Sequence, residues 1–165
     1  MGGRVFVGDD IRTGPGARLE IRFNDRSTLT LGENARVTID QFVYAPSGGS
    51  RQALAILRGV FRFATGQIGK LVPRSIAFTT PVATAGIRGT AFLGGELTVG
   101  MPPGQSHYGF QVIEGAIEVI SPGGSVVLDE PGEGTFLPLD RIAAPTPVRQ
   151  WTEEEAAEAQ DALAF

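Results

Sequence analysis

The stretch RLEIRFNDRSTLTLGENARVTID (residues 18–40) alternates apolar and polar side chains in three successive short segments. Neighbouring side chains of a β-strand point to opposite faces, so this period of two predicts strands at 18–23, 27–31 and 36–40. The residues between these segments are of types that favour tight turns. The stretch therefore predicts three short strands, each with one solvated face and one buried face.

The β pattern continues beyond this stretch and is interrupted by glycines. Residues 52–63 are interpreted as two strands that meet at Gly59, although residues 53–57 alone would also fit a helical turn. An aliphatic residue, a charged residue and a glycine recur at 57–59, 87–89 and 113–115. Because their spacing is too uneven for a strict solenoid repeat, we interpret these triplets as corners of a rolled sheet.

The segment TPVATAGIRGTAF (residues 80–92) contains the second triplet. It is too rich in β-branched residues for a helix and too interrupted by glycine for one regular strand. We expect Gly86 and Gly89 to let the backbone turn here. The residues expected to fill the interior behind this corner are Ile87, Ala91 and Phe92.

The C-terminal third ends in a different kind of structure. Pro122 to Gly124 lies between two strand patterns and predicts a hairpin. The chain becomes proline-rich after Phe136, and Thr152 with Glu155 then forms the signature of a capped helix. We expect Trp151, directly before this helix, to anchor the tail to the body of the protein or to a partner.

Composition limits the classes of protein to be considered. The chain has 165 residues, of which 23 are glycine, and a formal net charge of −4. This charge gives no overall electrostatic case for nucleic-acid binding. Cysteine is absent, which excludes disulfides and thiolate metal sites.

No apolar run approaches the length of a membrane span. The start Met1-Gly2-Gly3 would also fit a removed leader, so it says little about the compartment.

These patterns predict an all-β fold with one short C-terminal helix. A rolled sheet, a β-sandwich and a β-solenoid-like arrangement all remain open. We divide the chain into a β-domain at residues 4–138 and a proline-rich segment with an acidic helix at residues 139–165.

The residues that carry chemistry in enzymes are sparse. His107 is the only histidine, and we interpret it as an exposed residue of a loop rich in proline and glycine. The acidic pairs Asp9–Asp10 and Asp129–Glu130 join neighbours that point to opposite faces of a strand, so neither pair converges on one ligand. Residues 66–70 (GQIGK) lack the spacing of a phosphate-binding loop. We therefore expect a protein that is not an enzyme and that has no metal or cofactor.

Candidate partner-binding residues are three arginines and the tryptophan. Arg58, Arg62 and Arg88 would together suit an anionic ligand, although each would also fit a solvated strand face or a bond to loop carbonyls. Trp151 is included because it precedes the C-terminal helix and is expected to anchor the tail to the body of the protein or to a partner.

Several motifs, in order, resemble the FecR-type domain. They are GDDIRTG (residues 8–14), ARLEIRFND (17–25), STLTLG (27–32), IDQFVY (39–44), GVFRF (59–63) and the segment 80–92. The resemblance covers roughly residues 5–120. Two turns depart from the family pattern, because Arg26 stands where a glycine is usual and Gly32-Glu33-Asn34-Ala35 replaces the usual Gly-Pro-Asn-Ser.

The resemblance implies an all-β fold, a periplasmic or exported location, and a role in binding rather than catalysis. It implies a module of the bacterial cell envelope that binds a protein partner or senses a signal. Sigma-factor regulation is not carried over, because the chain lacks the membrane-crossing parts of the ferric-citrate regulator.

A structural or glycan-binding envelope module is the alternative, and association between copies of the chain is left open. The polar outer faces of the first strands would offer a surface to a polymer. The residues of this surface are Arg18, Glu20, Arg22, Thr28, Thr30, Arg36 and Thr38.

Overall fold

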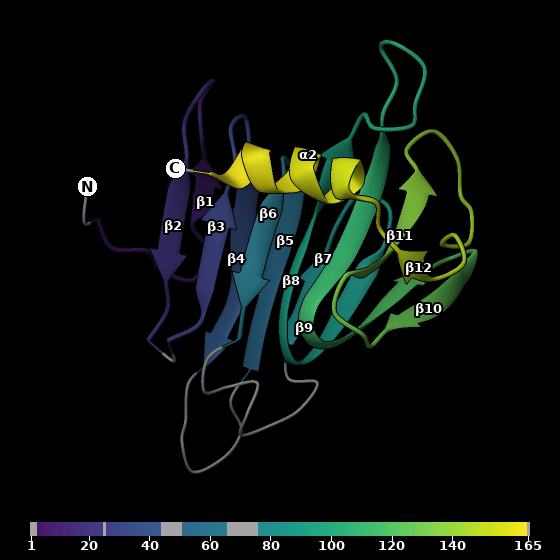
Figure 1. Cartoon of the computed structure of the whole chain (residues 1–165). Coiled ribbons are helices and arrows are strands. Elements are labelled where there is room, and N and C mark those ends of the chain that lie inside the picture. Colours follow the sequence, from purple (N-terminus) through teal and green to yellow (C-terminus); the bar gives the residue numbers. More distant parts are fainter. Residues whose placement is uncertain (1–2, 25, 44–50, 66–75, 165) are drawn as a thin grey trace.

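A computed structural model describes residues 3–24, 26–43, 51–65 and 76–164, giving the backbone alone for residues 41–43, 51, 52, 88 and 89. Twelve strands and one helix lie in these residues (Figure 1). The strands are β1 (Asp10–Arg12), β2 (Leu19–Arg22), β3 (Thr28–Leu31), β4 (Arg36–Val43), β5 (Arg51–Arg58), β6 (Phe61–Ala64), β7 (Ile76–Thr79), β8 (Thr84–Leu97), β9 (His107–Ser121), β10 (Gly124–Leu128), β11 (Glu133–Pro138) and β12 (Arg149–Gln150); the helix is α2 (Glu153–Leu163).

The expected strands are confirmed, including the three in residues 18–40 and the pair that meets at Gly59. Gly59 has a φ of 92°, a left-handed conformation that side chains disfavour. The alternative of a helical turn at residues 53–57 is wrong, because these residues lie within β5. The hairpin between β9 and β10 is also confirmed.

The strands form one sheet that divides into two arms at β8. Along one edge of β8, residues 84–87 pair with β7 and residues 91–94 pair with β6, while β9 follows the other edge. The β7 arm thus contains β1, β4, β5 and β7, with the first half of β8, the second half of β9, and β10. The β6 arm contains β2, β3 and β6, with the second half of β8, the first half of β9, β11 and β12.

The boundary between the arms lies in the predicted corner. The register of β8 against β9 shifts between Arg88 and Ala91 and again between Ala91 and Phe92. At this irregularity the Thr90 hydroxyl donates to the Ala116 carbonyl at 2.6 Å. This strand carbonyl thus has a hydrogen-bond donor where the backbone pairing is irregular. The chain is not broken into separate strands here, however, and Gly86 is paired inside regular β structure. A bulge bends one long strand, so the two arms share a continuous backbone.

The two arms face each other across a phenylalanine core. Phe78 of the β7 arm lies 4.7 Å from Phe63 and 5.6 Å from Phe61 of the β6 arm, measured between ring centroids. Phe92 packs edge-on to Phe78 at 5.3 Å, and all four rings are fully buried. The all-β prediction is confirmed in the form of a rolled sheet, closed by contacts between its arms.

One predicted surface is divided by this topology. Glu20, Arg22 and Thr28 belong to the β6 arm, whereas Arg36 and Thr38 belong to the β7 arm. The polar outer faces of the first strands therefore do not form a single surface.

Helix α2 lies across the outer face of the β6 arm (Figure 1). Its buried residues Ala159 and Leu163 cluster with Leu93 and Leu97 of β8 and with Trp151. The predicted capping box is present, with Thr152 and Glu155 bonded to each other's backbone N–H groups. No helix among the described residues is both long and apolar enough to cross a membrane.

Candidate functional site

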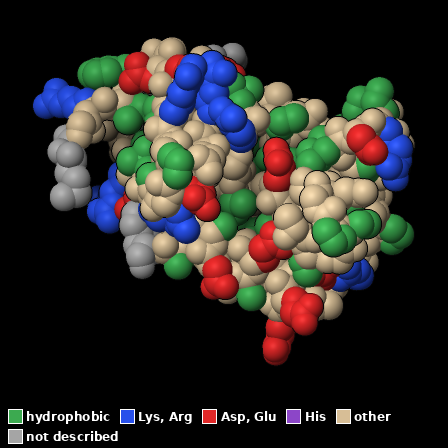
Figure 2. Space-filling view, turned by 90° about the horizontal axis from the view of Figure 1, so that it is seen from above, with side chains coloured by type: hydrophobic (Ala, Val, Ile, Leu, Met, Phe, Trp, Pro, Cys, Tyr) green, Lys and Arg blue, Asp and Glu red, His purple; other side chains and the backbone are tan. Residues whose placement is uncertain are grey.

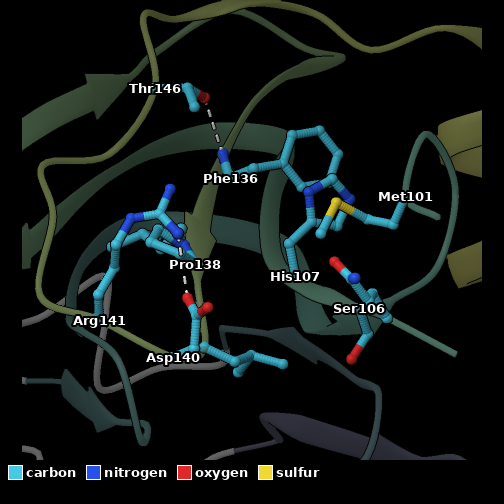
Figure 3. A pocket seen from close by; sticks show the side chains of 11 residues that line it. Met101, Ser106, His107, Phe136, Pro138, Asp140, Arg141 and Thr146 are labelled. Carbon is cyan, nitrogen blue, oxygen red and sulfur yellow. Dashed lines mark hydrogen bonds and ion pairs between the residues drawn. The ribbon is translucent and has the colours of Figure 1, made fainter.

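A cleft of about 470 Å³ opens at one end of the β6 arm (Figure 3). One wall is the loop between β8 and β9, and the other is the end of β11 with the segment that follows it. The lining residues are Met101, Gln105, Ser106, His107, Phe136, Leu137, Pro138, Leu139, Asp140, Arg141 and Thr146. The lining combines apolar and aromatic side chains with a few polar ones, as is usual in binding sites.

The floor of the cleft is one end of an aromatic stack. The ring of His107 lies 4.0 Å from that of Phe136 at an interplanar angle of 12°, and Phe136 lies 4.8 Å from Trp151 at 8°. Stacked aromatic rings are rigid and bury a large area, which suits them to hold a site in shape. The stack connects the cleft to the start of α2.

Two glycines make room for the innermost ring. A Cβ atom at Gly109 would lie 2.8 Å from the indole of Trp151, and one at Gly134 would overlap the indole nitrogen. Only glycine permits this close approach of a ring to the sheet. Trp151 is therefore buried against its own sheet, and of the two roles expected for it the structure shows the anchor to the body.

The interpretation of His107 as an exposed loop residue is wrong. It begins β9 and is half-buried, and burial lowers the pKa of its imidazole below the ordinary value, partly opposed by a hydrogen bond to the Val99 backbone. Its Nε2 atom is buried and has no hydrogen-bond partner among the described residues. The lowered pKa favours the neutral form of the ring, which serves as a flat surface in the stack.

A carboxylate of α2 fixes the wall opposite β11. Glu158 accepts hydrogen bonds from the Thr98 N–H at 2.8 Å and from the Val99 N–H at 2.7 Å. These groups begin the loop that carries Met101 and Ser106 into the cleft. The position of α2 and the shape of the cleft are thus connected through charge-assisted hydrogen bonds, which are stronger than neutral ones.

The rim of the cleft is exposed and carries both charges. Asp140 and Arg141 form an ion pair at 3.1 Å, and both side chains are largely exposed. Such a pair contributes little to stability, so both groups are available to a ligand. Leu139 beside them is 37% exposed. In the view from above, acidic, basic and apolar side chains are interspersed over the surface (Figure 2).

Two of the predicted partner-binding arginines lie in different arms of the sheet. Arg58 is exposed at the end of β5 in the β7 arm, whereas Arg62 is exposed on the outer face of the β6 arm. The backbone of Arg88 pairs with Ala116 at the boundary, and its side chain lies outside the described part. Their role in partner binding stays a prediction.

The acidic pairs have structural partners. Asp10 bonds Arg36 and Arg12, which lowers its pKa to about 2, so it is ionised at neutral pH. Asp9 accepts the Phe6 N–H, and the N–H groups of Asp129 and Glu130 both donate to Glu133. Residues 66–70 lie outside the described residues.

Sequence reasoning missed the cleft because its walls are far apart in sequence. The residues from Met101 to Ser106 and from Leu139 to Thr146 have the composition of ordinary connecting loops. The proline-rich composition after Phe136 was the one signal, and it did not indicate that this segment returns to the loop before His107.

Comparisons with known proteins agree with this fold. The family model described as FecR protein matches residues 9–118. Two crystal structures of a candidate anti-sigma factor from Parabacteroides distasonis ATCC 8503 are similar, with TM-scores of 0.66 and 0.67 and 12% sequence identity. Each similarity covers 90% of this chain but only 63% and 62% of the other, so the chain spans less than two thirds of that protein's length. No curated protein matches the sequence. With two thirds of its residues matched by the family model, the chain belongs to the FecR family.

Proposed function

We propose that this chain is a non-enzymatic, signal-sensing module of the bacterial cell envelope that binds a protein partner at the cleft. Membership of the FecR family and the similarity to a candidate anti-sigma factor support a regulatory role. A periplasmic or exported location is part of the proposal. Control of a sigma factor is not part of the proposal.

The observation that carries this proposal is the form of the cleft. Its floor consists of the stacked rings of His107 and Phe136, and its rim offers Asp140 and Arg141 in opposite charge. A short extended segment of a protein, with one apolar side chain between polar groups, has the matching chemistry. The Glu158 side chain of α2 holds one wall of the cleft. A ligand that moves this wall would therefore change the position of α2.

The proposal is tested by comparing two matched variants as bait in envelope extracts of the source bacterium. Leu139→Glu places a charge in the cleft rim, whereas Leu57→Glu places one on the β7 arm, and the two leucines are 37% and 42% exposed. We expect wild type and Leu57→Glu to retain the same protein and Leu139→Glu to lose it. Equal recovery with both variants, or no protein with wild type, contradicts the proposal.

A structural or glycan-binding role is the second candidate. It is favoured by the outer face of the β7 arm, which no described helix covers. One cross-strand row there carries four hydroxyl groups, those of Thr38, Thr79, Thr84 and Ser125, with Ala55 and Ile120 between them. Co-sedimentation with peptidoglycan at low salt separates the two functions: protein that stays in the supernatant excludes the glycan.

A further inference from the structure

The edge strand β10 lacks the charged residues and prolines that often prevent edge strands from pairing. The edges at β1 and β2 carry charges, namely Asp10 and Arg12 on one strand and Glu20 and Arg22 on the other. By contrast, β10 reads GSVVL, without charge or proline. An uncharged edge rich in β-branched residues is suited to pairing with another strand.

The unpaired backbone groups of β10 can be assigned from its register. The hairpin has two turn residues, and Ser121 pairs with Gly124 beside the turn. Residues that flank such a turn form a hydrogen-bonded pair, and these pairs alternate along the strands. Val126 therefore directs its N–H and C=O groups toward β9, while Ser125 and Val127 direct theirs away from it. No described strand pairs with that side of β10.

The backbone N–H groups at both ends of this free edge already have hydrogen-bond partners. The Gly123 N–H donates to the Ser121 hydroxyl at 3.2 Å, and the Asp129 N–H donates to the Glu133 carboxylate at 3.2 Å. The segment at Ala143 also packs against the turn, because the Ser121 hydroxyl bonds the Ala143 carbonyl. The free edge is therefore short and consists of the groups of Ser125 and Val127.

We propose that β10 pairs antiparallel with β10 of a second copy of the chain, about a two-fold axis at Val126. This arrangement places Ser125 opposite Val127 of the second copy, and Val127 opposite Ser125 of the second copy. The backbone N–H and C=O groups of Ser125 and Val127 all face the second copy. Both pairs can therefore exchange two backbone hydrogen bonds. A two-fold interface requires this self-complementarity, and the edge has it.

Side chains agree with this arrangement. Val127 and Ile120 are exposed on the outer face next to the edge, and a second strand would cover part of both. No charged residue lies within β10, so the pair brings no like charges together. The interface is small, so the dimer is weak and forms at high protein concentration. Since β10 does not line the cleft, this inference is independent of the proposed function.

The first measurement is sedimentation equilibrium of the whole chain from micromolar to millimolar concentration. The monomer mass is 17.4 kDa, and wild type is expected to approach twice this value. Val127→Lys should weaken association at least about tenfold, because it places like charges near each other across the axis. Leu57→Lys, on the same outer face but away from the edge, should associate as wild type does. A mass that stays monomeric at millimolar concentration overturns the inference.

Amide hydrogen exchange locates the interface. The N–H groups of Ser125 and Val127 should exchange more slowly as the concentration rises, whereas that of Val126 should not change, because it is bonded to β9 at all concentrations. A dimer in which all three amides are independent of concentration uses another surface and also overturns the inference. Thermal unfolding at low concentration checks that both lysine variants remain folded.

Discussion

The two arms share one inner core but differ on their outer faces. Phe63 of the β6 arm and Phe78 of the β7 arm are equally buried between the arms. On the outer face, Leu93 of the β6 arm is apolar and covered by α2, whereas Ala77 of the β7 arm is small and exposed. A strand covered on both faces therefore has consecutive apolar residues, while a strand covered on a single face alternates apolar and polar residues.

The strongest test of the shared core is Phe78→Ala. Because Phe78 contacts both Phe61 and Phe63 across the arms, its removal leaves a cavity that neither arm can close. We expect a loss of about 3–5 kcal/mol in the free energy of unfolding, measured by urea denaturation. Phe6→Ala, at an exposed position, should change it by less than about 0.5 kcal/mol. Similar small losses for both variants would mean that the arms do not depend on one core.

The difference between the outer faces can be tested with two glycines in regular strands. Gly134 lies under Trp151 in the β6 arm, and Gly86 lies in the β7 arm with no atom near its Cβ position. Gly134→Ala should cost about 1–3 kcal/mol, because the indole must move, and should shift the fluorescence of Trp151. Gly86→Ala should be close to neutral by both measurements. Equal losses would contradict the packing described for Trp151.

Most of the fold could be predicted from sequence, because alternation, turn residues and the capping box are local signals. Residues 18–40 and 152–155 show this directly. The position of the corner at Thr90 could be predicted from sequence, but its form as a bulge could not. The bulge depends on pairing with Ala116 in another strand. The cleft could not be predicted, because it arises where Met101 and Leu139 meet through long-range contacts. Burial of Trp151 depends in the same way on Gly134, a residue that has no local relation to it.

Attachment of α2 to the β6 arm should weaken in acid. Hydrogen bonds from Arg149, at 2.7 Å to each carboxylate oxygen, lower the pKa of Glu155 to about 2, although partial burial opposes this. A lowered pKa stabilises the fold above the ordinary value of 4.5, and this contribution is lost as the pH falls from 4.5 toward 2.

The measurement is the free energy of unfolding of wild type and Glu155→Gln as a function of pH. At pH 7 the variant should be less stable by about 1–2 kcal/mol, and the difference should shrink through this window. Asp10 also titrates near pH 2 but is present in both proteins, so its effect cancels. A difference that is independent of pH would show that the charge of Glu155 does not hold the helix.

The smallest expected effect concerns the connection between α2 and the cleft. Glu158→Gln keeps the shape of the side chain but replaces a carboxylate that accepts the Thr98 and Val99 N–H groups. We expect a loss of about 1 kcal/mol in stability, and faster hydrogen exchange at these two amides than in wild type. Glu154→Gln, on the exposed side of the same helix, is the matched control and should change neither quantity. If exchange at Thr98 and Val99 is the same in both variants, the helix does not fix the loop, and occupation of the cleft would have no route to α2 through Glu158.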